Sequence, residues 1–367
     1  MKSEKIRNIV TTVLFCGFLL LFFAWGLLKP DDALSSSERR PLEQFPELSA
    51  QTVLSGEFME KFEDYSVDQF PLRDDFRTLK SITQFYVLAQ KDNNGVYLAD
   101  GHASKLEYPL NEESVEYAAQ RLGYIYETYL KDAGITPYLC IIPDKNCFMA
   151  QENGYPSIDF DELEALMLEN TEFAEYIDIY DLLELGDYYT TDIHWRQDKI
   201  VDVAQRLAQA MGVPFEGDFE KVVLDIPFYG VYYGQSALPL KPDELSYLTN
   251  AAIEGAHAFD YETNSDMPVY SMELAGGRDP YEMFLGGSKS LITIENPDAL
   301  SDKELIIFRD SFGSSLTPLL IESYSKITVI DIRYIMSSNL GMFVDFDNQD
   351  VLFMYSLPVL NNSSTIK

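Results

Sequence analysis

The sequence predicts an α/β domain with a mainly parallel sheet, preceded by a transmembrane helix and a helical stalk. Short apolar runs that end at breakers, such as residues 136–142 before Pro143, are typical of buried strands. Stretches with helical periodicity separate these runs, which is the pattern of βαβ units. With 367 residues, of which 46% are hydrophobic, the chain can bury a sizeable core, and whole-chain disorder is excluded.

The membrane helix is predicted from residues 9–28, twenty residues without a charge. At about 1.5 Å per residue this stretch matches a hydrocarbon core of about 30 Å. Lys2, Lys5 and Arg7 precede it and favour a cytoplasmic N-terminus, so the rest of the chain is expected outside the cell. A cleaved signal peptide is the alternative. Residues 25–30 offer no small-x-small cleavage site, and we therefore expect an uncleaved, single-pass anchor in the cell membrane.

Charge and composition disfavour several classes of function. The chain has 27 basic and 60 acidic residues, a net charge of -33, so phosphate backbones would repel it and no nucleic-acid partner is expected. Three cysteines are too few for a disulfide framework, although a Cys140–Cys147 bridge stays open. With three histidines, no CxxC and no HExxH, we expect neither a metal site nor a soluble cofactor.

The chain divides into three predicted parts. Residues 1–29 form the cytoplasmic tip and the transmembrane anchor. Residues 30–95 form a linker and a stalk, in which apolar residues at helical spacing predict two helices interrupted at Pro71. We expect these helices to pack beneath the main domain. Residues 96–367 form the extracellular α/β domain.

Within this domain several elements are marked by caps and periodicity. Asn111 is a candidate cap for a helix that runs to Lys131 and ends at Gly134. A second helix is predicted over residues 200–211, where apolar residues recur at i, i+3, i+4 and i+7. Besides residues 136–142, the predicted strands are residues 175–179, 305–308, 326–332 and 351–355.

The first segment that could carry chemistry reads Asp192-Ile193-His194-Trp195 and lies just before the helix at residues 200–211. In an extended stretch, residues i and i+2 share a face, so Asp192 could bind the His194 ring and fix its tautomer. The alternative is a loop histidine whose ring is satisfied by a neighbouring acid.

The second segment is the predicted strand at residues 305–308, which is followed by Ser311 and by a helix-like stretch at residues 316–324. Open α/β folds place reactive groups where a parallel strand turns into a helix. Ser311 is therefore a candidate nucleophile. The alternative is that Ser311 caps the helix, with Asp310 as another possible cap.

Together the two segments supply an alcohol, an imidazole and a carboxylate, the minimum set for acyl transfer through a serine ester. His102 and His257 are the other two imidazoles of the chain, so His194 is the default base. The rival interpretation is a non-catalytic envelope scaffold or glycan-binding protein, in which Asp192, His194 and Ser311 form a structural cluster.

At these segments the sequence resembles the DHHW family of bacterial envelope proteins, whose naming motif here reads Asp192-Ile193-His194-Trp195. The family looks related to the alginate O-acetylation proteins of the SGNH-hydrolase-like group. The matching blocks follow one order along nearly the whole chain: residues 38–42, 56–58, 68–74, 94–98, 143–145, 232–235, 284–287, 309–312 and 331–334.

The resemblance implies an SGNH-hydrolase-like α/β/α sandwich with a Ser311, His194 and Asp192 triad. It also implies a serine-dependent O-acetyltransferase or acetylesterase that moves acetyl groups onto or off cell-surface glycans. Acetyl-CoA is not expected outside the cell, so a transferase would need a membrane-embedded partner to deliver the acyl group. The sequence departs from the family motif at its second residue, which is Ile193 instead of a histidine; the Asp-x-His spacing is kept.

The chain lacks the GDSL block and the separate Asn block of ordinary SGNH enzymes, which leaves the oxyanion donors open. Our candidates are the Ser311 amide and the Gly286-Gly287 turn, with a purely structural turn as the alternative. Three cations could hold substrate or instead pair with nearby acids: Arg309, Lys145 and Arg333. Three aromatic residues could stack on a sugar or instead pack in the core: Trp195, Tyr232 and Tyr233.

Overall fold

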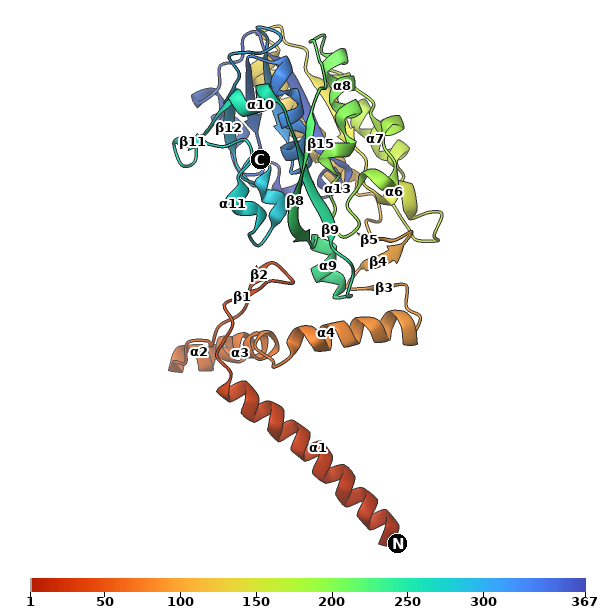
Figure 1. Ribbon diagram of the computed structural model, residues 1–367. Coiled ribbons are helices and arrows are strands. Elements are labelled where there is room, and N and C mark those ends of the chain that lie inside the picture. The colour runs from red at the N-terminus through yellow and green to blue at the C-terminus, as the bar shows by residue number, and fades with distance from the viewer. Residues whose placement is uncertain (1) are drawn as a thin grey trace. The chain divides into compact units, whose positions relative to one another are not determined.

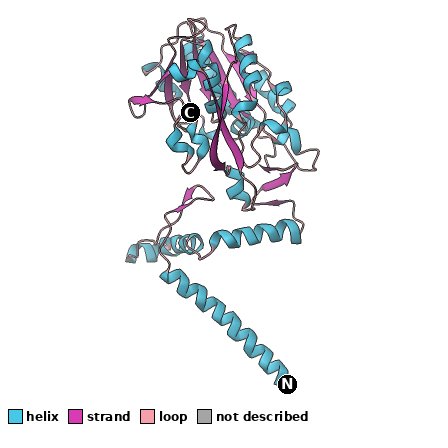
Figure 2. Cartoon of the chain, in the orientation of Figure 1, coloured by secondary structure: helices cyan, strands magenta, loops and turns pink. Residues whose placement is uncertain are grey.

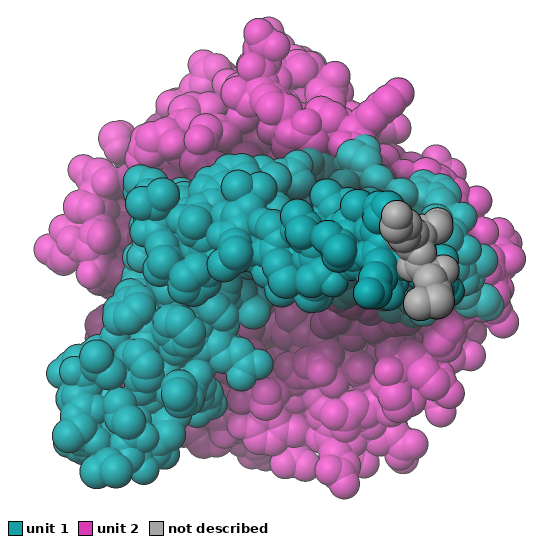
Figure 3. All heavy atoms as spheres, turned by 90° about the horizontal axis from the view of Figure 1, so that it is seen from below, with its two compact units in different colours: residues 1–93, 233–239 teal, residues 94–232, 240–367 magenta. Residues whose placement is uncertain are grey.

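The computed structural model describes residues 2–367 (Figure 1). The chain forms two compact units, which Figure 3 distinguishes by colour. The smaller unit runs to Asn93 and includes Tyr233–Pro239, and the larger unit comprises Asn94–Tyr232 and Leu240–Lys367. The return of residues 233–239 to the N-terminal unit is not part of the predicted division.

The smaller unit is mostly helical. Its first helix, α1 (Lys2–Leu28), is the one helix in the described chain that is long and apolar enough to cross a membrane. The break predicted at Pro71 separates two helices and is confirmed. The remaining elements are β1 (Leu34–Ser35), β2 (Arg40–Pro41), α2 (Ala50–Ser55), α3 (Glu57–Asp68), α4 (Arg73–Ile82), a π-helical turn (Thr83–Val87) and β3 (Asp92–Asn93).

The larger unit contains an eight-stranded sheet, shown in magenta in Figure 2. The segment β14-β13-β15-β6-β7 is parallel, and β12, β10 and β11 extend it with antiparallel strands. In spatial order the strands are β11 (Ser265–Met267), β10 (His257–Asp260), β12 (Leu291–Glu295), β14 (Lys326–Ile330), β13 (Glu304–Arg309), β15 (Asp350–Ser356), β6 (Tyr138–Ile142) and β7 (Glu175–Tyr176).

Helices and two small hairpins complete this unit. The hairpins pair β4 (Val96–Ala99) with β5 (His102–Lys105), and β8 (Glu220–Phe228) with β9 (Asp243–Thr249). The helices are α5 (Glu112–Ile125), α6 (Asn146–Met149), α7 (Phe160–Asn170), α8 (Val201–Ala210), α10 (Ala251–Gly255), α11 (Met272–Ala275), α12 (Phe312–Leu316) and α13 (Leu357–Asn361). Helix α9 (Val231–Ser236) crosses the boundary between the two units.

The core lies on both faces of the sheet, which is the three-layer arrangement expected for an α/β/α sandwich. Side chains alternate along β13: Leu305 and Ile307 join the apolar cluster that includes α8, whereas Ile306 and Phe308 join the cluster that includes α5 and α7. Figure 2 shows helices on both sides of the sheet. The predicted fold class is confirmed.

Several local predictions need correction. The helix capped by Asn111 ends at Ile125 and continues as a π-helical turn (Tyr126–Leu130), and most of the helix expected over residues 316–324 is a 3-10 helix (Thr317–Ser323). The Cys140–Cys147 alternative is wrong, because the cysteines of the described chain are free thiols. The antiparallel strands and the β8–β9 hairpin are additions to the predicted elements.

Candidate active site

The predicted Asp-x-His pair is formed. His194 Nδ1 lies 2.6 Å from Asp192 Oδ1, and the backbone N–H of His194 donates to the same oxygen at 3.1 Å. Asp192 Oδ2 accepts the backbone N–H of Val231 at 2.8 Å. Asp192 is 1% exposed, so its carboxylate is held by hydrogen bonds in a dry environment. This arrangement places the proton of the neutral imidazole on Nδ1 and leaves Nε2 as an acceptor.

Ser311 completes a continuous chain of hydrogen bonds. Its Oγ lies 2.8 Å from His194 Nε2, although the two residues are 117 positions apart. Ser311 lies in the short turn between β13, which ends at Arg309, and α12, which begins at Phe312. Ser311 is partly exposed, whereas the residues on either side of it, Asp310 and Phe312, are buried.

The capping interpretation of Ser311 is wrong. In the described chain Ser311 makes no side-chain capping bond, and Asp310 Oδ1 instead accepts the Phe312 N–H at 3.0 Å. Asp310 Oδ2 accepts the backbone N–H and the hydroxyl of Ser356 at 2.8 and 2.6 Å. Asp310 therefore connects the turn after β13 to the end of β15, and the serine hydroxyl is left to His194.

Tyr281 is a site residue that sequence reasoning missed. Its ring lies parallel to the His194 ring, with centroids 3.8 Å apart and planes 8° apart. The Tyr281 hydroxyl donates to Ser315 Oγ at 2.9 Å and to the Ser311 carbonyl at 3.3 Å. Burial raises the pKa of Tyr281 far above its usual value, so it stays a neutral donor. No motif surrounds Tyr281, so no signal in the sequence pointed to it.

The prediction that Trp195 and Tyr232 form a sugar-stacking wall is wrong, because both are buried, at 0% and 2% exposed. Trp195 Nε1 donates to Ser315 Oγ at 3.0 Å and to the Phe312 carbonyl at 3.2 Å. These bonds join residues 189–195, which we call the histidine loop, to α12. Tyr232 packs in a small apolar cluster. Tyr233 belongs to the smaller unit, and its predicted role stays untested.

Lys145 supports the backbone of the histidine loop rather than facing a ligand. It is 0% exposed, and its Nζ donates to the carbonyls of Asp192 at 2.7 Å and Tyr189 at 3.1 Å. The ammonium lies 4.9 Å from the centre of the Tyr232 ring, within range of a cation–π contact. Burial lowers the pKa of Lys145 to about 8, against the opposing effect of nearby acids of which Asp144 is the strongest.

Arg333 and Arg309 are engaged with acids, as the ion-pair alternative expected. Arg333 Nε and Nη2 bind the two carboxylate oxygens of Asp331 at 2.9 and 2.7 Å. Arg309 is 1% exposed and lies 3.6 Å from the same carboxylate. Desolvation lowers the pKa of Arg309 from its usual value.

The Gly286-Gly287 turn has positive φ values of 68° and 76°. The Gly287 N–H donates to the Phe284 carbonyl at 3.2 Å, and its own carbonyl accepts from Arg309 at 3.4 Å. These bonds favour the structural interpretation of the turn. By contrast, no hydrogen bond from the Ser311 amide occurs within residues 2–367, so this amide stays the candidate oxyanion donor.

A second group of residues that motif reasoning missed fixes the start of the histidine loop. Asp243 accepts the backbone N–H and hydroxyl groups of Thr190 and Thr191 at 2.6–2.8 Å. Gly230 allows the loop to approach, because a Cβ there would lie 2.4 Å from the Asp192 Cα. The paired threonines before Asp192 are the one local sequence signal for this network.

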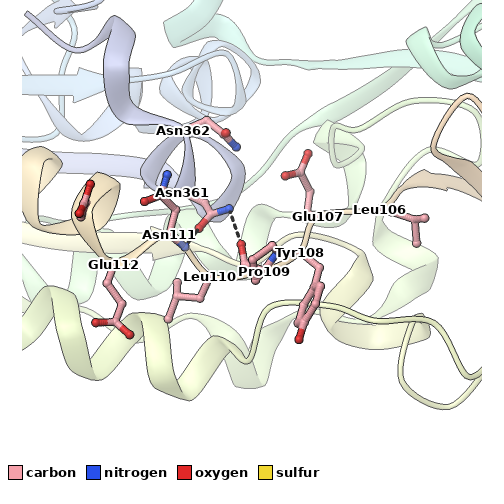
Figure 4. A pocket seen from close by; sticks show the side chains of 10 residues that line it. Leu106, Glu107, Tyr108, Pro109, Leu110, Asn111, Glu112, Asn361 and Asn362 are labelled. Atoms are coloured by element: carbon pink, nitrogen blue, oxygen red, sulfur yellow. Dashed lines mark hydrogen bonds between the residues drawn. The ribbon is translucent and has the colours of Figure 1, made fainter.

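The larger unit also has a cavity of about 600 Å³, shown in Figure 4. Asp192, His194 and Ser311 are not among the residues that line it. Its lining includes Glu107, Tyr108, Asn111 and Asn361, and Asn361 Nδ2 donates to the Pro109 carbonyl at 3.3 Å. The described residues contain no group of three or more His, Cys, Asp or Glu side chains able to hold a metal ion.

Comparisons with known proteins agree with the fold. Neither a protein-family model nor a curated protein matches the sequence. A DHHW family protein from Eubacterium siraeum is 20% identical, with 75% of this chain and 95% of that chain covered and a TM-score of 0.61. Bacillus cereus PatB1 is 18% identical, with 72% and 96% covered and a TM-score of 0.57.

PatB1 is also known with a sulfonyl adduct, at 17% identity, with 72% and 95% covered and a TM-score of 0.56. The O-acetyltransferase domain of Pseudomonas putida AlgJ, 15% identical over 73% of this chain and 92% of that chain, gives a TM-score of 0.46, too low to argue a shared fold. The expected resemblance to a DHHW family protein is thus confirmed in structure, and the chain shares the α/β fold of that protein and of PatB1.

Proposed function

We propose that the chain is a serine-dependent acyl-transfer enzyme that moves O-acetyl groups on glycans of the cell envelope. The observation that carries the proposal is the pair of hydrogen bonds, 2.6 and 2.8 Å long, that connects Asp192, His194 and a partly exposed Ser311. In this arrangement Ser311 is the nucleophile, His194 is the general base, and Asp192 orients the base.

In the first half of the reaction Ser311 Oγ attacks the acyl carbonyl carbon and transfers its proton to His194 Nε2. Asp192 keeps the Nδ1 proton in place and stabilises the imidazolium. The tetrahedral oxyanion accepts a hydrogen bond from the Ser311 amide. When the intermediate collapses, the leaving oxygen takes the proton from Nε2, and the acyl group stays on the serine.

In the second half an acceptor hydroxyl loses its proton to His194 Nε2 and attacks the acyl-serine. Collapse returns the proton to Ser311 and releases the new ester. A sugar hydroxyl as acceptor makes the enzyme a transferase, and water makes it an esterase. The two reactions share the acyl-enzyme and differ in which acceptor the site admits.

The choice of an acetyl group and a glycan rests on the sequence resemblance to envelope O-acetylation proteins. The membrane-spanning length of α1 supports a location at the cell membrane, with the larger unit outside. For a transferase, a membrane-embedded partner would deliver the acyl group. A non-catalytic scaffold or glycan-binding protein is the alternative, and the experiment below distinguishes the two.

The proposal is tested by labelling the detergent-solubilised full chain with phenylmethanesulfonyl fluoride and by hydrolysis of p-nitrophenyl acetate. We expect one sulfonyl group on Ser311, and we expect Ser311→Ala to lose the label and at least 100-fold in kcat, about 2.7 kcal/mol. Ser325→Ala, a partly exposed serine that bonds the Asp302 carbonyl, is the matched control. Equal hydrolysis by Ser311→Ala and the unsubstituted chain would remove the serine from the mechanism.

A further inference from the structure

Helix α4 of the smaller unit has two different faces. Arg73, Arg77 and Ser81 follow i, i+4 and i+8 and so share one face. Both arginines bind Glu38, at 2.5 and 3.1 Å, and Ser81 Oγ donates to the Ser236 carbonyl at 2.7 Å. This face is therefore covered by the rest of its own unit.

Another face of α4 is apolar and partly exposed. It consists of Phe76 and Leu79 together with Leu72, the residue just before the helix, and these are 36%, 58% and 46% exposed. We call these three residues the apolar face of α4. The chain continues beyond the helix with Tyr86, Val87 and Leu88, which are 59–73% exposed. Large exposed apolar patches occur at surfaces that bind other proteins, ligands or membranes.

Direct contacts connect this region to α1. The rings of Phe22 and Phe70 are stacked, with centroids 5.4 Å apart, and the edge of Phe76 meets the Phe22 ring at 5.7 Å. Pro71 lies beside Gly26, where a Cβ would be 3.9 Å from the proline Cδ. The turn between α3 and α4 is thus packed on the last two turns of the apolar helix.

The depth of these contacts follows from helix geometry. Phe22 is three to four residues from the middle of the uncharged run at residues 9–28, which is about 5 Å along the axis. A hydrocarbon layer extends about 15 Å from its midplane. Even if the rings of Phe70 and Phe76 lie a full contact distance further out, they are within about 11 Å of the midplane. A membrane that contains α1 therefore also surrounds the start of α4.

We propose that α4 lies in the interface of the same membrane that α1 spans, with its apolar face against the lipid acyl chains. The proposal rests on an uncleaved α1 and is independent of the proposed catalysis. Helix α4 has the features of an interfacial helix, namely one apolar face, another face of charged residues and low net hydrophobicity.

The test uses the full chain, one copy per phosphatidylcholine nanodisc, with Cys16→Ser and Cys147→Ala to leave only buried Cys140. A nitroxide spin label is attached to the cysteine of Leu79→Cys. Its collision rates with oxygen, which concentrates in lipid, and with a water-soluble nickel chelate are measured by electron paramagnetic resonance. Asp74→Cys, whose side chain is 55% exposed on another face of α4, is the matched control. Leu19→Cys in α1 provides the lipid benchmark.

We expect the label at Leu79 to collide preferentially with oxygen, as at Leu19, and the label at Asp74 to collide preferentially with nickel. Val87→Cys, in the exposed segment after α4, is a second site should the Leu79 variant fail to fold. Nickel access at Leu79 and Val87 equal to that at Asp74 would show that the face lies in water. Low access to both reagents would show that another protein surface covers it. Either result overturns the proposal.

Discussion

The ring of Tyr281 lies flat on the imidazole that is proposed to become charged during acyl transfer. A tyrosine face attracts a cation, and the stacked contact also limits rotation of the His194 ring. The hydroxyl of Tyr281 adds bonds to Ser315 and to the Ser311 carbonyl, so this one side chain touches both halves of the proposed site. Tyr281 is therefore a positioning residue in the proposed mechanism.

Replacing the ring should matter more than removing the hydroxyl. Tyr281→Leu is expected to lower kcat about 10-fold, since cation–π contacts contribute about 0.5–2 kcal/mol. Tyr281→Phe retains the stacked ring and should lose about 3-fold or less, with Ser315 left one hydrogen bond short. Steady-state kinetics with an acetyl ester, together with the pH dependence of kcat/KM, measures both effects. Equal loss in the two variants would show that stacking contributes nothing.

Lys145 acts on the same loop from inside the unit. Lys145→Met removes the donors to the carbonyls of Asp192 and Tyr189 and should lower kcat about 10-fold while KM changes little. In proton NMR spectra of the same variant, the low-field signal of the His194 Nδ1 proton should weaken. The reason is that the loop carrying Asp192 is no longer fixed by these two hydrogen bonds. Lys105→Met, at a lysine whose side chain is 52% exposed, is the control. An unchanged signal and rate in Lys145→Met would exclude this positioning role.

At the residue scale the sequence allowed the Asp192, His194 and Ser311 contacts to be predicted because each lies in a recognisable motif. Tyr281 could not be predicted, since it is one of 24 tyrosines and its contact with His194 depends on how distant loops pack. Lys145 lies in a matching block, yet its direction toward backbone carbonyls depends on burial that composition does not reveal.

At the scale of elements, the histidine loop depends on a close approach of two backbone segments. A Cβ at Gly230 would lie 2.3 Å from the Thr191 carbonyl oxygen and 2.4 Å from the Asp192 Cα, so the loop carrying Asp192 must shift if Gly230 is replaced. Gly230→Ala is expected to lower kcat at least 10-fold because Asp192 loses its place beside His194. Kinetics with an acetyl ester checks this, and Gly255→Ala, where a Cβ would meet nothing within 4 Å, is the matched control. Wild-type kinetics in Gly230→Ala would contradict the argument.

The connection between β2 and the end of α3 should respond to acid. Arg40 binds both carboxylate oxygens of Asp68, at 2.8 and 2.5 Å, which lowers the pKa of Asp68, and Asp68 Oδ2 also accepts the Glu43 N–H. Because the pKa of Asp68 is lower in the folded chain, its ionised carboxylate stabilises the fold at pH values above the unfolded-state pKa of about 3.9. This stabilisation is lost as the pH falls below that pKa. Protection of the Glu43 amide from hydrogen exchange, corrected for the intrinsic rate, should fall below pH 4. In Asp68→Asn it should be low and independent of pH; the same pH dependence in both chains would contradict this.

The parallel strands could be predicted because both faces of each are buried, which gives continuous apolar runs such as Leu305 to Phe308. The antiparallel edge could not be predicted in the same way. β12 has the composition of a strand, but its direction depends on its connections, and β10 is only four residues long with an exposed histidine at its start. The π-helical turn after α5 likewise has no signal in residue type.

At the scale of the whole molecule, the proposed site depends on the stability of the sheet beneath it. Ile307 is 0% exposed in the middle of β13, four residues before Ser311. Ile307→Ala should lower the free energy of unfolding by about 2–5 kcal/mol, and Ile307→Val by about 0.5–1.5 kcal/mol. Urea unfolding of the detergent-solubilised chain measures both, followed by the fluorescence of buried Trp195 in a Trp25→Phe background. A loss below 1 kcal/mol for the alanine variant would contradict the packing described for β13.

In the proposed mechanism, the two hydrogen bonds between Asp310 and Ser356 determine when during synthesis the site can form. All three residues of the proposed triad are present once synthesis has reached residue 311. The Ser356 amide and hydroxyl that bind Asp310 are added only with β15. A nascent chain that ends before residue 350 contains the three side chains of the proposed triad. The turn that carries Ser311 then lacks its hydrogen bonds to Ser356. If the proposed function holds, ester hydrolysis should therefore appear only late in synthesis, and chains truncated before β15 should lack it.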